Sequence, residues 1–169
     1  RLASAAGVRC FVFLSSVKAM GDCRSPETRT EAACTLPVDA YGLSKWQAEC
    51  ALRAEFSDAA MSVAIVRPVL VYGAQARGNL QSLALGVRFG LPRPPQLGRR
   101  SMIALDDLVE LLCVIAQNPP SGVRTWIACG ADAYSTQQIY DLMRAGLGKS
   151  RGKAWLPRWA WYFGSSLVD

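Results

Sequence analysis

Two short apolar segments with a helix-like segment between them limit what this chain can fold into. Residues 10–15 (CFVFLS) and 61–66 (MSVAIV) are mostly aliphatic or aromatic, which is typical of strands buried on both faces. Residues 41–56 lie between them and have the pattern of a helix, for which Asp39 is a suitable N-cap. A strand, a helix and a second strand in this order form a βαβ unit with parallel strands. The sequence therefore predicts an α/β fold built on a parallel sheet.

The pattern changes after residue 73, where apolar strands give way to helix-like and proline-rich segments. We expect helices over 79–89, 106–117 and 136–147, extended segments over 101–105 and 125–129, a loop over 91–98, and a final helix near Pro157. Residues 18–39 are polar, contain Gly, Pro and Thr, and are expected to form a long loop. The chain thus has two parts, which meet near residue 73.

The composition argues against several classes of protein. The apolar fraction of 51% is typical of a folded domain, and no apolar run approaches the roughly 18 residues of a membrane span. Six cysteines occur without a C-x-x-C pair, and there is no histidine. We therefore expect no metal site and a reducing, cytoplasmic environment. The net charge of +6 is compatible with nucleic acid, a small polyphosphate or a solvated face; we expect no nucleic-acid partner.

A tyrosine and a lysine that share one helix face are candidates for proton transfer. Tyr41 and Lys45 are four residues apart. The phenol of a free tyrosine has a pKa of about 10, and a nearby ammonium favours its phenolate. Ser15 and Ser16 end the first strand, where open α/β sheets bind their ligands. The Tyr-x-x-x-Lys pattern alone also fits an ordinary surface pair, but the serines favour a catalytic site.

Three motifs in this order resemble the extended short-chain dehydrogenases/reductases of the NAD-dependent epimerase/dehydratase family. They are FVFLSSVKAMGD, DAYGLSKWQAE and IVRPVLVYG, and the resemblance covers about residues 7–147. It implies that residues 1–73 form the C-terminal half of a Rossmann-like dinucleotide-binding sheet. Residues 74–169 would form a small α/β substrate-binding region, with 101–129 partly returning to the sheet.

The resemblance also implies a function and a set of site residues. The reaction would be oxidoreduction at C4 of a nucleotide sugar, a UDP-hexose, with NAD or NADP. The protein would be a UDP-sugar 4-epimerase or 4-keto reductase in surface-polysaccharide precursor synthesis, and a homodimer. The implied catalytic residues are Ser16, Tyr41 and Lys45. The implied cofactor contacts are Ser15, Tyr41, Lys45, Pro68, Val69 and Leu70. The implied substrate contacts are Ser16, Lys18, Asn79 and Arg100, with Arg99 as the alternative to Arg100.

Two departures from the family pattern affect these expectations. No acidic residue stands at position 17 or 18, where the sugar 4,6-dehydratases carry Asp and Glu, so dehydratase chemistry is not expected. The sequence also contains no G-x-x-G-x-x-G turn for the cofactor diphosphate. By comparison with the family, we expect roughly a hundred further residues in front of this chain. The chain alone is then expected to be inactive and not to bind NAD(P).

Two alternatives stay open at this point. One is a non-catalytic nucleotide-binding fragment, and the other is a dehydrogenase of a steroid or another alcohol with the same Ser-Tyr-Lys site. The tryptophan-rich end, with Trp155, Trp159 and Trp161, fits either a membrane-surface or partner helix or a helix packed on the substrate-binding region.

Overall fold

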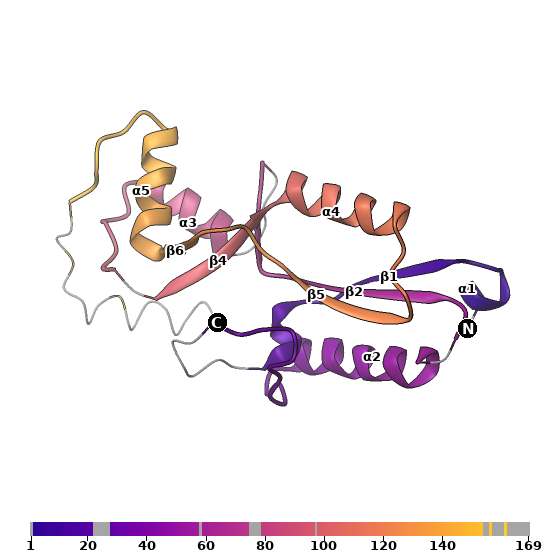
Figure 1. The fold of residues 1–169 in the computed structure, drawn as a ribbon. Helices are drawn as coiled ribbons and strands as arrows, with labels where there is room; N and C mark the ends of the chain where they lie inside the picture. The colour runs from indigo at the N-terminus through magenta and orange to yellow at the C-terminus, as the bar shows by residue number, and fades with distance from the viewer. Residues whose placement is uncertain are drawn as a thin grey trace. The chain divides into compact units, whose positions relative to one another are not determined.

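The computed structural model describes residues 2–21, 28–57, 59–74, 79–96, 98–153, 156 and 161 (Figure 1). The chain forms two compact units. The first unit comprises Arg1–Val71 and Ile103–Cys129, and the second comprises Tyr72–Met102 and Gly130–Asp169. The chain therefore leaves the first unit after Val71, returns to it at Ile103, and leaves it again after Cys129.

The first unit is built on a parallel sheet of three strands. These are β1 (Cys10–Leu14), β2 (Ser62–Pro68) and β5 (Val123–Ala128), in the order β1-β2-β5. Cys10 pairs with Ser62 and Val63 with Val123, both in parallel register. Helix α2 (Ala40–Phe56) connects β1 to β2, and α4 (Leu105–Gln117) precedes β5. The α/β fold with a parallel sheet is confirmed.

The central strand β2 is buried along almost its whole length. Val63 and Ile65 belong to one apolar cluster together with Phe56 at the end of α2. Ala64 and Val66 belong to a second cluster with residues of α4. Successive side chains of a strand point to opposite faces, so α2 and α4 cover the two faces of the sheet (Figure 1). This two-sided burial explains why the segment is apolar at nearly every position.

Two short helical turns flank β1. Helix α1 (Leu2–Ala5) precedes it, and the 3-10 helix η1 (Val17–Met20) follows it. Ser16 is the N-cap of η1, and its Oγ accepts a hydrogen bond from the Lys18 amide at 3.2 Å. Asp39 caps α2 as predicted, because its carboxylate accepts from the Gly42 amide at 2.8 Å.

The second unit contains two helices and part of a small sheet. Helix α3 (Asn79–Arg88) packs against α5 (Thr136–Gly146). Strand β4 (Arg99–Ala104) is antiparallel to β6 (Ala133–Ser135), and the sheet order is β3-β4-β6, with β3 at Leu70–Tyr72. A capping box between Ser135 and Gln138 starts α5. Arg93 in the loop after α3 forms an ion pair with Asp141 of α5.

Several boundaries differ from those expected. Strand β2 continues through Arg67 and Pro68, and β4 begins two residues earlier than predicted. The short strands β3 and β6 were not expected, because three residues are too few for an alternating pattern to be recognised. The final helix expected near Pro157 lies outside the described residues, apart from Leu156 and Trp161. The assignment of cofactor binding to 1–73 and of substrate binding to 74–169 stays a prediction.

Candidate active site

The strand ends of the first unit bring two of the sequence motifs to one edge of the sheet. β1 and β2 are parallel neighbours, so their carboxyl ends meet at the same edge. The Ser15 amide donates to the Val66 carbonyl at 2.7 Å, and the Val69 amide donates to the Ala128 carbonyl at 3.1 Å. Ser15 and Ser16, which follow β1, and the Pro68–Leu70 segment at the end of β2 therefore lie at the same edge of the sheet. Open parallel sheets bind their ligands at this edge.

The start of helix α2 is held against η1 by a glycine. A Cβ added to Gly42 would lie 2.6 Å from the Lys18 carbonyl oxygen and 2.8 Å from an Asp39 carboxylate oxygen. Only a residue without a side chain fits at this distance. The close approach brings Tyr41, one residue earlier, to the short turn that Ser16 begins.

Lys45 is anchored beside the Tyr41 ring. Its Nζ donates a hydrogen bond of 3.0 Å to the Leu14 main-chain carbonyl. The same Nζ lies 5.8 Å from the centroid of the Tyr41 ring and 5.1 Å from the centroid of the Phe13 ring. The side chain of Tyr41 is 54% exposed. An ammonium has three donors, and the bond to Leu14 uses one of them. The others suit hydroxyl groups of a ligand, while the exposed phenol is accessible for proton transfer.

Below this edge, a buried carboxylate connects the same elements. Glu49 of α2 accepts from Arg67 at both oxygens, from Nε at 2.9 Å and from Nη2 at 2.6 Å. The Ser15 hydroxyl donates to Glu49 at 2.6 Å, and Arg53 donates to it at 2.9 Å. Glu49, Arg67 and Ser15 are all buried. The Ser15 hydroxyl therefore points into the core and its amide bonds to Val66, so the predicted cofactor contact would fall to its main-chain carbonyl.

Opposing effects set the charge state of this carboxylate. Burial alone raises the pKa of Glu49, but hydrogen bonds from Arg67, Ser15 and Arg53 outweigh burial and lower that pKa below its ordinary value. The hydrogen bond to Glu49 in turn raises the pKa of the Arg67 guanidinium. The pair is therefore ionised at neutral pH, with the donors of Arg67 aligned in the bidentate geometry that suits a carboxylate.

The network extends to the rest of the sheet edge. Arg67 Nη1 donates to the Glu31 carbonyl at 3.1 Å, and the Glu31 carboxylate accepts from the Ile127 amide at 3.1 Å. Arg53 also donates to the Thr125 hydroxyl at 3.1 Å. The loop after η1 and strand β5 are thus joined to the same carboxylate.

The predicted substrate contacts are divided between the units. Lys18 is exposed on η1 in the first unit. Asn79 begins α3, and Arg100 is exposed on β4 opposite Tyr134, both in the second unit. Arg99 differs from Arg100 because its guanidinium donates to the Ala133 carbonyl at 3.2 and 2.9 Å. The roles of all these residues stay predictions.

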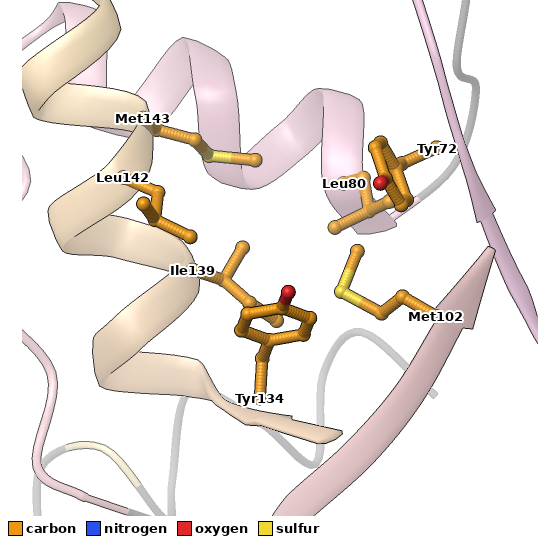
Figure 2. Close-up of a pocket in the computed structure, with 7 residues that line it drawn as sticks. All are labelled: Tyr72, Leu80, Met102, Tyr134, Ile139, Leu142 and Met143. Atoms are coloured by element: carbon orange, nitrogen blue, oxygen red, sulfur yellow. The ribbon is translucent and has the colours of Figure 1, made fainter. Parts of the chain in front are cut away.

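The second unit contains an apolar pocket that was not anticipated from the sequence (Figure 2). Its volume is about 290 Å³. The lining residues are Tyr72, Leu80, Met102, Tyr134, Ile139, Leu142 and Met143. The two tyrosine hydroxyls are the only side-chain oxygen or nitrogen atoms among these residues, so the pocket suits a flat or aliphatic part of a ligand.

The described part of the chain offers neither a cluster of metal ligands nor a membrane-spanning helix. Among those residues, no group of three or more His, Cys, Asp or Glu could hold a metal ion. None of the helices described there is long and apolar enough to cross a membrane.

Comparison with known proteins determines the family. A model of the NAD-dependent epimerase/dehydratase family matches residues 1–128. The chain belongs to this epimerase/dehydratase family. A UDP-glucose 4-epimerase of Vibrio cholerae is 30% identical over 179 residues, covering 96% of this chain and 53% of the relative. The N-acetyl-α-D-glucosaminyl-diphospho-ditrans,octacis-undecaprenol 4-epimerase of Escherichia coli O157:H7 is 27% identical, covering 89% of this chain and 46% of the relative. The chain thus spans about half the length of these curated relatives.

Solved structures have the same fold. A dTDP-glucose 4,6-dehydratase of Bacillus anthracis in complex with NAD matches with a TM-score of 0.76 at 18% identity, covering 89% of this chain and 50% of that one. A UDP-N-acetylglucosamine 4-epimerase of Methanobrevibacter ruminantium matches with a TM-score of 0.74 at 13% identity, covering 91% and 52%. The resemblance inferred from the three motifs is confirmed, and the chain has the fold of this epimerase/dehydratase family.

Glu49 and Gly42 were not predicted as part of the site. Tyr41, Lys45 and Glu49 are spaced four residues apart and so lie on one face of α2. That spacing was a usable signal for Glu49, as was Arg67 at the end of an apolar strand. Gly42 gives no such signal, because its neighbour Lys18 is distant in sequence.

Removing the charge of Glu49 is expected to destabilise the first unit strongly. Glu49→Gln leaves the Arg67 guanidinium buried without its counter-ion, and we expect a loss of about 3–5 kcal/mol in the free energy of unfolding. Urea unfolding at pH 7 measures it. Glu110→Gln, at an exposed position of α4, is the control and should change stability by less than about 0.5 kcal/mol.

The stability of the native protein should depend on pH more strongly in acid than that of Glu49→Gln. Because the folded-state pKa of Glu49 is lowered, its contribution is present above the ordinary glutamate pKa of about 4.3 and is lost as pH falls through the folded pKa. The stability difference between the native protein and Glu49→Gln should therefore shrink in acid. A stability difference that stays constant until the protein unfolds in acid would contradict the ionised state assigned to Glu49.

Gly42→Ala is expected to displace η1 from α2, because the new methyl group would overlap the Lys18 carbonyl. We expect a lower midpoint of thermal unfolding. The matched control is Gly146→Ala in α5, where a Cβ meets nothing within 4 Å and the better helix propensity of alanine should leave stability unchanged or slightly higher. Equal effects of both substitutions would refute the close contact.

Proposed function

We propose that the complete protein is a nucleotide-sugar 4-epimerase or 4-keto reductase that acts at C4 of a UDP-hexose with NAD or NADP. Membership of the epimerase/dehydratase family and the likeness to the Vibrio cholerae enzyme support this function. The observation that carries it is the anchored Lys45 ammonium beside the exposed Tyr41 ring at the edge where Ser16 lies. Synthesis of surface-polysaccharide precursors is the role we propose for the product.

The residues of the first unit fit a nicotinamide cofactor. Lys45 has donors left for ribose hydroxyls, and the Pro68–Leu70 main chain lies at the same sheet edge. When bound, the cofactor supplies the hydride chemistry at C4. Tyr41 takes the proton of the C4 hydroxyl in oxidation and returns it in reduction, with the Lys45 ammonium beside its ring. Ser16 orients the sugar by hydrogen bonding to a hydroxyl group.

In the second unit, we propose that Asn79 and Arg100 bind the diphosphate and that the apolar pocket takes the base. A guanidinium suits a phosphate because it donates two parallel hydrogen bonds. Arg100 is the better candidate than Arg99, whose donors already bond to Ala133. A flat nucleotide base suits the apolar lining around Leu80 and Met102.

The role of Tyr41 is tested by Tyr41→Phe in the complete protein. We expect kcat for UDP-glucose or UDP-N-acetylglucosamine to fall at least about a hundredfold, with little change in KM, because the hydroxyl acts in the reaction step. Product configuration by NMR and nicotinamide absorbance give the two readouts. The exposed position of the ring should leave thermal unfolding unchanged. A loss of less than about tenfold contradicts this role.

A second candidate substrate is a sugar linked to a polyprenyl diphosphate. The Escherichia coli relative is named for such a substrate, and the pocket of the second unit is apolar enough for an aliphatic chain. The complete protein should be given UDP-N-acetylglucosamine and, in detergent, N-acetylglucosaminyl-diphospho-undecaprenol. Turnover of the UDP-sugar supports the first candidate, whereas turnover of the lipid-linked sugar alone overturns it in favour of the second.

A further inference from the structure

Positive charge is concentrated in the second unit. Ten of the 19 Lys and Arg residues and three of the 13 acidic residues lie in its sequence, which gives it a net charge of +7. The first unit has nine basic and ten acidic residues, for a net charge of −1. One acid of the second unit, Asp141, is already paired with Arg93. The second unit therefore has far more positive charge than one diphosphate ligand requires.

Part of this charge lies in one corner of the second unit, which we call the basic corner: Leu85, Arg88, Phe89, Leu147 and Lys149. The Lys149 Nζ donates to the Arg88 carbonyl at 3.0 Å, so the end of α3 and the segment after α5 are in contact. The Phe89 amide donates to the Leu85 carbonyl at 2.9 Å, which fixes Phe89 one turn beyond Leu85. Arg88 and Lys149 are both exposed.

The basic corner also exposes large apolar side chains. Phe89 is 82% exposed, and Leu85 and Leu147 are each 49% exposed. A single exposed apolar residue is ordinary, but here Leu85 and Phe89 flank Arg88 at the end of α3, and Leu147 is two residues from Lys149, which bonds to Arg88. These residues give the basic corner an amphipathic composition. Such surfaces insert aromatic and aliphatic side chains into a lipid headgroup layer while their Lys and Arg residues contact anionic lipids.

We propose that the second unit docks on an anionic membrane surface through the basic corner. Phe89, Leu85 and Leu147 enter the headgroup layer, and Arg88 and Lys149 contact lipid phosphates. The argument for this occupant is charge complementarity: the unit has a net charge of +7, and anionic lipids attract basic surfaces. A nucleic acid has the same charge, but the exposed leucines of the basic corner offer it neither base stacking nor hydrogen bonds. The proposal is independent of the function proposed above.

Vesicle co-sedimentation tests this docking. The protein should sediment with vesicles of phosphatidylcholine mixed with phosphatidylserine, remain in solution with phosphatidylcholine alone, and be released by raised salt. The double substitution Arg88→Gln with Phe89→Ser, at two exposed positions, should weaken binding at least about fivefold. The matched control in the first unit is Arg124→Gln with Val38→Ser; Arg124 is exposed and Val38 is 83% exposed, and binding should be unchanged.

Three results would overturn the proposal. The first is equal sedimentation with both kinds of vesicle, and the second is equal binding by the Arg88/Phe89 variant and the control variant. The third is a DNA or RNA oligonucleotide that binds more tightly than the anionic vesicles and loses affinity in the Arg88/Phe89 variant. Tyr41→Phe should sediment like the native protein. Failed docking and failed activity are therefore seen in separate assays.

Discussion

The bidentate pair between Glu49 and Arg67 is the interaction on which the rest of the first unit depends. Glu49 lies in α2, Arg67 lies in β2, and Ser15 follows β1, so three separate elements meet at one buried carboxylate. Burying two charges is costly, and such a pair favours one arrangement more than it adds stability. Because Tyr41 and Lys45 share a helix face with Glu49, the pair fixes their position relative to the strand ends.

The strands and helices of the first unit could be predicted from the sequence, but the buried contacts between them could not. Strand burial and helix capping are local properties, so the βαβ unit and the Asp39 cap could be predicted. The ordering of three motifs was enough to indicate the family. The role of Glu49 depends on a partner 18 residues away in sequence, and Gly42 is required by contact with Lys18. The helical spacing places Glu49 on the face of Tyr41 and Lys45 but does not identify its partner Arg67, and the contact of Gly42 leaves no pattern at all. The pocket of the second unit could not be predicted either, because segments distant in sequence line it.

The two units differ in the physical means by which they work. The first unit has nearly balanced charge, and internal hydrogen bonds hold the Lys45 ammonium and the Ser16 hydroxyl, with the ammonium beside the Tyr41 ring. The second unit is strongly basic and contains an apolar pocket within its small sheet and helices. Precise placement suits proton transfer, whereas charge and apolar surface suit the capture of anionic and amphipathic molecules.

The hydrogen bond between Lys45 and the Leu14 carbonyl limits the effect of amino-acid substitutions at position 14. Its acceptor is a main-chain carbonyl oxygen, which every amino acid supplies, so a substitution at position 14 does not remove the acceptor. Substitutions that alter the sheet surface there would leave the ammonium where it is. The position of Lys45, for which we propose a role beside Tyr41, therefore depends little on which side chain the supporting strand carries at position 14.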